Sequence, residues 1–314
     1  MTSTLTDGVL SNGGRAIGAA PTAAATTATP GKRPPRDLAW LGLLPFFAFL
    51  FLFLIVPAIS VFIEALKDGD GNFSFSSMNE AFTGQNFDAF WFSIRFSAGA
   101  ALVGVIFGAL LAYAAATATR PRWLRNLVTS FSGVAANLGG IPLAFAFLAL
   151  LGKQGVATKA LSAAGLDLYS TSWFGFDEWP GLVIVYSYFN IPLMLLITLP
   201  AIDGLKASWR EASSNLGGTS LTYWRRVGLP VLAPSLMGGF LLLFTNSFSA
   251  YATAAALTDS SRIVALRIGF FLGGDVDAGG DAVGYSLAAW MIIIMAVSMS
   301  LYWVLRKRAE RWQS

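Results

Sequence analysis

The 314-residue sequence contains no cysteine and no histidine. Without cysteine the chain can form neither a disulfide framework nor a thiolate metal site. Without histidine it lacks the commonest general base, the commonest metal ligand and the usual switch near neutral pH. Charged residues are also scarce, at 12% of the chain. These absences disfavour enzymatic chemistry, and the sequence predicts neither catalytic residues nor a metal site.

Hydrophobic residues are abundant instead. They make up 55% of the chain, and the mean hydropathy of +0.62 lies far above the usual soluble range. The apolar runs do not alternate apolar and polar residues, as the strands of a membrane barrel do. The composition therefore predicts an all-α integral membrane protein.

Six apolar runs divide the chain. Each is near or above the roughly 20 residues that a helix needs to cross about 30 Å of hydrocarbon. The predicted spans are 38–63, 96–119, 126–151, 180–202, 231–257 and 283–305. Together they predict one membrane domain over 38–305, with a polar connection at 203–230. Residues 1–37, rich in Ala, Thr, Gly and Pro, are expected to be a disordered tail, and 306–314 a basic end.

The basic residues predict the orientation. Fifteen of the 21 Lys and Arg residues fall in the tail, in the second-to-third connection, in the fourth-to-fifth connection and at the C-terminal end. By the positive-inside rule these segments face the cytoplasm, and so do both termini. The six basic residues predicted outside are Lys67, Arg95, Lys153, Lys159, Arg262 and Arg267. Topology thus accounts for the net charge of +4 and the pI near 9.4, and no nucleic-acid partner is expected.

One polar stretch interrupts the apolar chain. From Trp209 to Pro230 it reads WREASSNLGGTSLTYWRRVGLP. A capping box at Ser208 and Glu211 predicts a first short helix, which the Gly217-Gly218 pair would end. A second short helix, capped by Thr219 or Ser220, would follow before the fifth span. Periodicity alone is compatible with an interfacial helix whose arginines meet anionic lipid.

The residue pattern favours another interpretation. Glu211-Ala212-Ser213, then Gly217, then Leu229-Pro230 resembles the EAA loop of permease subunits in binding-protein-dependent ABC importers. In the family this loop is a coupling helix that docks on a separate ATPase subunit. The resemblance implies a docking role for Glu211, Ala212, Ser213, Leu216, Gly217, Leu229 and Pro230.

The resemblance also implies partners. They are two ABC ATPase subunits that hold ATP and Mg²⁺, a second permease subunit (identical or different), an extracytoplasmic solute-binding protein and the lipid bilayer of the bacterial cytoplasmic membrane. The sequence itself contains no G-x-x-x-x-G-K-[ST] phosphate loop, so the chain is not expected to bind ATP by that route. No Asp, Glu, Lys or Arg lies in the middle of a predicted span, which disfavours an ion-coupled carrier. A stand-alone channel or facilitator is the alternative function.

Some polar residues lie within the predicted spans. They are candidates to line a translocation path, and they are Asn137, Tyr186, Asn190, Asn246, Ser249 and Thr253. Such residues more often form hydrogen bonds between helices, and we favour that interpretation for each. The spacing of Gly104 and Gly108 similarly predicts a helix-packing face.

The solute is predicted only from a second, weaker resemblance. The segments LLLFTNSFSAYATAAALT and LRKRAERW are similar to permeases of the polyamine, phosphonate and ferric-iron branch. Within that branch the prediction is a polyamine such as spermidine or putrescine. The alternatives within the importer class are phosphonate, ferric iron and a sugar.

Overall fold

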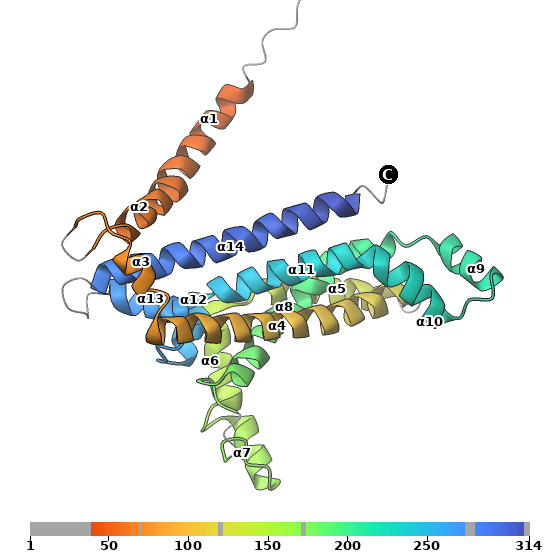
Figure 1. The fold of residues 1–314 in the computed structure, drawn as a ribbon. Coiled ribbons are helices and arrows are strands. Elements are labelled where there is room, and N and C mark those ends of the chain that lie inside the picture. The colour runs from red at the N-terminus through yellow and green to blue at the C-terminus, as the bar shows by residue number, and fades with distance from the viewer. Residues whose placement is uncertain (1–38, 69–70, 119–121, 171–173, 274–279, 311–314) are drawn as a thin grey trace, which may run out of the picture. The chain divides into compact units, whose positions relative to one another are not determined.

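The computed structural model describes residues 39–68, 71–118, 122–170, 174–273 and 280–310. The predicted disordered tail, 1–37, lies outside the described residues. The chain divides into two units, one ending at Phe51 and the other beginning at Leu52. Within the described ranges the regular structure is helical, apart from one isolated β-bridge between Lys67 and Phe73. Figure 1 shows the helices.

The first unit contains α1, Ala39–Leu50, and the second contains α2, Val56–Ala65. A π-helical turn, Phe51–Ile55, connects them. A second π-helical turn, Trp224–Gly228, precedes the predicted fifth span. Both turns end two residues before a proline, Pro57 or Pro230. A proline ring clashes with the carbonyl four residues earlier, and the wider π turn relieves this clash without ending the helix.

Four long helices form most of the second unit. They are α4 (Gly84–Thr117), α8 (Trp179–Asp203), α11 (Leu229–Ser249) and α14 (Gly280–Glu310). The most extensive contact is between α4 and α8, and α11 packs on both. The predicted start of the second span at residue 96 is wrong, because α4 begins at Gly84. Polar and charged side chains in its first three turns kept that segment out of the apolar run.

Small residues bring α4 and α8 together. A Cβ on Gly108 would lie 2.5 Å from the Cβ of Met194 and 2.6 Å from the backbone oxygen of Ile191. A Cβ on Gly104 would lie 2.8 Å from the Cβ of Asn190. No side chain fits in either place, so the predicted packing role of these two glycines is confirmed.

The predicted third span, 126–151, is wrong as a single helix. The chain forms α5 (Arg122–Asn137), bends, and continues as α6 (Gly140–Leu151) and α7 (Val156–Ala163). Gly140, at the bend, has a φ of 72°, a conformation that favours glycine. The Gly139-Gly140 pair therefore ends one helix and lets the next leave in another direction.

The predicted fifth span, 231–257, is also divided. Ala250 has extended backbone angles (φ −75°, ψ 96°) and separates α11 from α12, Tyr251–Leu257. Two shorter helices in the second unit are α3 (Ser76–Glu80) and α13 (Val264–Leu272). The predicted basic end begins as a continuation of α14, which reaches Glu310.

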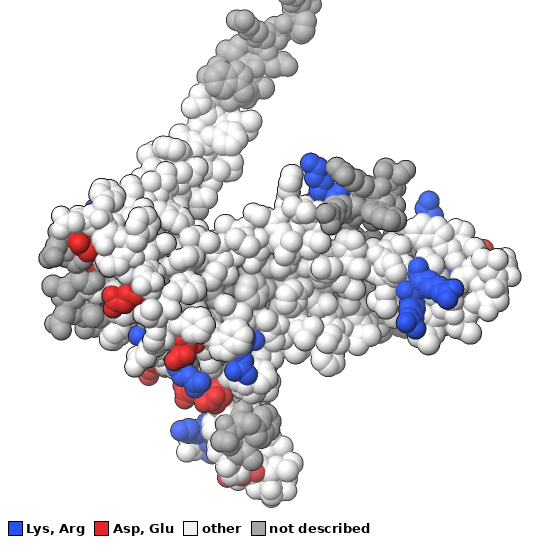
Figure 2. Space-filling model, in the orientation of Figure 1, with Lys and Arg blue, Asp and Glu red and all other residues white. Residues whose placement is uncertain are grey.

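Among the described residues, six helical segments are long and apolar enough to cross a membrane. They are Gly42–Ala65, Gly84–Thr117, Gly140–Ala163, Trp179–Asp203, Ser220–Ser249 and Gly280–Lys307. The predicted number of spans is thus confirmed, although several boundaries move. On the face in Figure 2, charged side chains gather near the two ends of α4 and α11, with an uncharged band between them.

Ion pairs join segments that the positive-inside rule assigns to the same side. Arg125, at the start of α5, contacts Asp203 at the end of α8, with 2.5 Å between Nη2 and Oδ2. Arg262 contacts Glu178 with 3.1 Å between Nη1 and Oε1. The first pair belongs to connections predicted inside and the second to connections predicted outside. The orientation itself stays a prediction.

Candidate functional site

The first residues of the polar stretch belong to α9, Ala207–Asn215. The predicted capping box is wrong: Lys206 is the N-cap, and no side chain caps the helix. The backbone N–H of Trp209 donates to the carbonyl of Lys206 at 3.1 Å, so the helix starts before Ser208. Ser208 is therefore already in the first turn, and Glu211 is an exposed residue of the helix interior.

The end of α9 agrees with the prediction. Gly217 has a φ of 75°, and its N–H donates to the carbonyl of Ser214 at 2.9 Å. The N–H of Gly218 donates to the carbonyl of Ser213 at 2.8 Å. These two bonds form a Schellman motif, which satisfies the last carbonyls of the helix and reverses the chain.

The second half of the stretch differs from the predicted separate helix. Thr219 caps α10, Ser220–Tyr223, by accepting a hydrogen bond from the N–H of Thr222 at 3.3 Å. The chain then passes through the π turn at Trp224–Gly228 directly into α11, so Ser220–Ser249 is one continuous helical run. The second half of the stretch and α11, Leu229–Ser249, are therefore parts of one helical run.

The stretch is concave, and two of its leucines are among the exposed residues, although Tyr223 is buried. A hollow of about 520 Å³ lies between α9 and the start of the following helix. Leu216 is 88% exposed and Leu221 is 76% exposed, and no residue of α9 is buried. The residues lining the hollow are Trp209, Ala212, Ser213, Leu216, Gly218, Thr222, Arg226, Val227 and Val231.

The predicted docking residues are only partly brought together. Ala212, Ser213 and Leu216 line the hollow. Glu211 is exposed outside it, and Gly217 forms the turn. Leu229 and Pro230 lie at the start of α11, where proline is tolerated in the first turn.

The polar residues of the spans fall into two groups. Tyr186, Asn190 and Thr253 are buried, whereas Asn137, Asn246 and Ser249 are exposed. Each buried member forms a hydrogen bond outside its own helix. Tyr186 Oη donates to the carbonyl of Ala250 at 3.0 Å, and Asn190 Nδ2 donates to Ser247 Oγ at 2.9 Å. Thr253 Oγ1 accepts from the N–H of Gly140 at 2.9 Å. The exposed members bond within their own helices, Asn137 Nδ2 to the carbonyl of Gly133 and Ser249 Oγ to that of Asn246.

These contacts support the interhelical interpretation for Tyr186, Asn190 and Thr253. The bonds of Tyr186 and Thr253 hold the chain at its two breaks, Ala250 and Gly140. Asn190 keeps one buried oxygen, Oδ1, without a hydrogen-bond partner.

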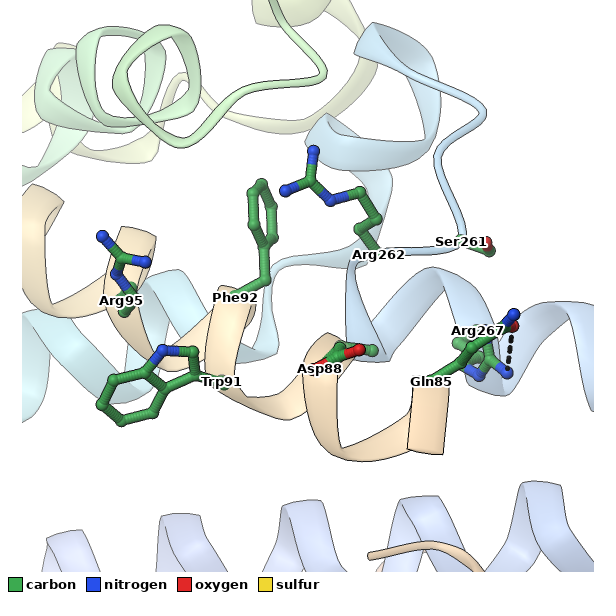
Figure 3. Close-up of a pocket in the computed structure, with 9 residues that line it drawn as sticks. Gln85, Asp88, Trp91, Phe92, Arg95, Ser261, Arg262 and Arg267 are labelled. Carbon is green, nitrogen blue, oxygen red and sulfur yellow. Dashed lines mark hydrogen bonds between the residues drawn. The ribbon is translucent and has the colours of Figure 1, made fainter. Parts of the chain in front are cut away.

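Sequence reasoning did not find a second concave site. A pocket of about 440 Å³ lies between the first turns of α4 and the segment 261–267. Figure 3 shows its lining, which contains Gln85, Asp88, Trp91, Phe92, Arg95, Ser261, Arg262 and Arg267. Arg95, which directly precedes the predicted second span, lies within α4, with its guanidinium 5.9 Å from the centre of the Trp179 ring. The signal that could have revealed the pocket is the presence of arginines where the positive-inside rule makes them rare.

Comparison with known proteins decides the family. Residues 104–311 match the family of the binding-protein-dependent transport system inner membrane component. The chain belongs to this family. The matched residues include the whole polar stretch and all the long helices except the first part of α4.

Several curated relatives of this transport component carry names that include their solutes. The putative ferric transport system permease protein FbpB 1 of Haemophilus influenzae is 24% identical over 226 residues, which cover 72% of this chain and 35% of the relative. The sulfate transport system permease protein CysW of Escherichia coli is 22% identical and covers 83% and 86%. A spermidine/putrescine transport system permease protein PotC homolog of Mycoplasma pneumoniae is 27% identical and covers 41% and 46%. The chain thus spans about a third of the length of the ferric relative and most of the sulfate one.

The fold of the transport component is also found among solved structures. A chain of a bacterial ABC transporter involved in the import of the acidic polysaccharide alginate superposes with a TM-score of 0.62 at 18% identity, covering 87% of this chain and 95% of that one. A complex of the alginate transporter with its pentasaccharide-bound periplasmic protein contains a chain with a TM-score of 0.63. At this identity the likeness shows the importer permease fold alone. The predicted fold class is thereby confirmed.

Proposed function

We propose that this chain is the membrane-spanning subunit of an ATP-driven importer, and that the stretch Trp209–Pro230 is where an ATPase subunit docks. The observation that carries the proposal is the exposed apolar surface of that stretch, within residues that match a transport-system membrane component. Exposed apolar groups around a hollow with polar edges are typical of a protein interface.

The helical geometry supports a mechanical role for the stretch. An ATPase subunit that holds Leu216 and Leu221 would grip the chain on both sides of the Gly217-Gly218 turn. Because α10 continues through the π turn into α11, displacement of the turn moves the fifth span. A π turn is frequent at functional sites and is a place where a helix can adjust its register.

The other subunits follow from the same proposal. A second permease subunit would complete the translocation pathway, and an extracytoplasmic binding protein would deliver the solute. In this arrangement ATP and Mg²⁺ belong to the ATPase subunits. We expect the complex in a bacterial cytoplasmic membrane, with the stretch Trp209–Pro230 on the cytoplasmic side.

For the solute, we propose a polyamine as the first compound to test. The named relatives include a spermidine/putrescine permease, but also ferric, sulfate and molybdenum permeases. The test measures the melting temperature of the binding protein that copurifies with the complex. Spermidine or putrescine should raise this melting temperature. Sulfate, which has the opposite charge, is the comparison ligand. A shift with sulfate and none with either polyamine would contradict the polyamine proposal.

The docking proposal is tested with Leu216→Asp. The permease is purified with its ATPase subunits and binding protein, and ATP hydrolysis is measured with and without the solute-loaded binding protein. We expect the variant to lose most of the stimulation, because a carboxylate would be desolvated in an apolar contact. The matched control is Leu166→Asp, a leucine 63% exposed in a connection predicted outside. Full stimulation of the Leu216 variant, or solute flux through the permease without any ATPase, would overturn the proposal in favour of a stand-alone channel.

A further inference from the structure

Basic residues predicted on the outer side converge in one place. Of the six, Arg95, Arg262 and Arg267 line the pocket of about 440 Å³ shown in Figure 3, here called the arginine pocket. Arg95 comes from α4 and the other two from a segment more than 160 residues later in the sequence. The positive-inside rule makes basic residues rare on the outer side of a membrane protein, so three arginines in one pocket there indicate a local function.

The three guanidinium groups are held mainly by neutral partners. Arg267 donates from Nε to Asn86 Oδ1 and from Nη2 to Gln85 Oε1. Arg262 lies 4.6 Å from the centre of the Phe92 ring and forms the ion pair with Glu178. Within the described part of the chain, that pair is the one salt bridge that any of the three arginines makes.

The charge of the pocket is therefore unbalanced. Its lining contains three arginines and one carboxylate, that of Asp88. Glu178, outside the lining, pairs with Arg262, so one positive charge stays in excess. Desolvation lowers the pKa of Arg267, although an arginine stays protonated at neutral pH. A partly desolvated cation without a carboxylate partner is stabilised when an anion arrives, and arginine binds carboxylates with two parallel hydrogen bonds.

The rim of the pocket resembles a protein interface. Trp91 is 55% exposed at the edge of the pocket, next to Arg95. Tryptophan and arginine are the residues most enriched among those that dominate binding energy between proteins. A free oxyanion would instead need donors that surround it, whereas Arg95 and Arg262 are both exposed and come from separate elements.

We propose that the arginine pocket receives carboxylate side chains of the extracytoplasmic solute-binding protein. This inference rests on the proposed function, because it needs an importer that uses such a protein. It assigns a docking contact to Arg95, Arg262 and Arg267, with Trp91 as the neighbouring apolar contact. Two of these arginines are anchored on aromatic rings and the third on side-chain amides, so the pocket is organised before the partner arrives.

The test uses the complete complex in proteoliposomes and its own solute-loaded binding protein. ATP hydrolysis is measured as the binding-protein concentration is raised. Arg95→Gln and Arg262→Gln should each increase the half-saturating concentration roughly tenfold while leaving the maximal rate unchanged, since loss of an interfacial charge pair weakens binding. The double variant should also lose most of the salt dependence of that concentration.

Two controls separate docking from folding. Lys67→Gln removes another outer basic residue, one that is already paired with Glu64 at 2.6 Å, and should leave the half-saturating concentration unchanged. Arg262→Lys keeps the charge but loses the paired hydrogen bonds and the stacking on Phe92, so its half-saturating concentration should lie between those of the unchanged complex and Arg262→Gln. Both glutamine variants should show the basal ATPase rate and elution volume of the unchanged complex.

Three results would overturn the inference. The first is an unchanged half-saturating concentration in both glutamine variants. The second is a change in the half-saturating concentration of solute while that of the binding protein stays the same, which would identify the pocket as a solute site. The third is that the binding protein does not stimulate ATP hydrolysis by the complex without substitutions. This result would contradict the proposed function as well.

Discussion

Two glycines of this chain are required for opposite reasons. Gly108 lies inside the α4–α8 contact, where a Cβ would be 2.5 Å from the Cβ of Met194. Gly217 lies on the surface, where a Cβ would meet nothing within 4 Å, but its φ is 75°. The first is a glycine because of its neighbours, and the second because of its own backbone.

The difference extends to the regions that contain them. The α4–α8 contact is complete within the chain: both helices bury residues along their length, and α8 is the most buried of the six candidate spans. The stretch Trp209–Pro230 is incomplete, because α9 buries no residue and Leu216 and Leu221, which follow it, are exposed. Changes in the first region should therefore reduce stability, whereas changes in the second should affect partner binding.

The largest loss of stability is expected from Gly108→Ala. The new methyl group would push α4 away from Met194 and Ile191, and overpacking of this kind costs about 1–3 kcal/mol. The melting temperature of the purified permease in detergent should fall, and less folded protein should reach the membrane.

The matched control is Gly133→Ala. A Cβ there meets nothing within 4 Å, and Gly133 lies inside the helix α5. Alanine should stabilise that helix by up to about 1 kcal/mol. Equal melting temperatures for the two alanine variants would contradict the packing role of Gly108.

An intermediate effect is expected from Asn190→Leu. The substitution removes the hydrogen bond to Ser247 Oγ between α8 and α11, and such bonds in membrane proteins contribute about 1 kcal/mol. The melting temperature should fall modestly, while Asn246→Leu, at an exposed position on α11, should leave it unchanged. If Asn190 instead lines the solute path, transport rate will change in proteoliposomes and the melting temperature will not.

Much of the fold follows from the sequence, because lipid demands long uncharged helices and these are visible as apolar runs. The number of spans and the glycine packing of α4 were predictable for that reason. Breaks within apolar runs were less visible. Gly139-Gly140 is a recognisable signal for the bend after α5, but Ala250 is extended because tertiary contacts hold it, including the bond from Tyr186 Oη to its carbonyl.

The candidate sites show the same division. The Gly217-Gly218 turn and the Thr219 cap were predictable because their hydrogen bonds are local. The capping box failed because the helix starts at Ala207, and local sequence did not define that start. The arginine pocket depends on contacts between α4 and residues 261–267, which are far apart in the sequence and carry no common motif.

The smallest effect on stability is expected at Gly217. Substitutions there distinguish a requirement for positive φ from a requirement for space. Gly217→Val strains the left-handed conformation by roughly 1–3 kcal/mol, but only within a stretch that buries little and can unfold locally. The melting temperature of the permease should therefore stay within about 1 °C, while ATPase stimulation by the loaded binding protein falls sharply. Gly217→Asn adds a side chain of similar size, yet asparagine tolerates positive φ, so it should keep most of the stimulation. If asparagine and valine reduce stimulation equally, Gly217 is required because a partner subunit packs against it. Both glycines would then be required for close packing, Gly108 within the chain and Gly217 between chains.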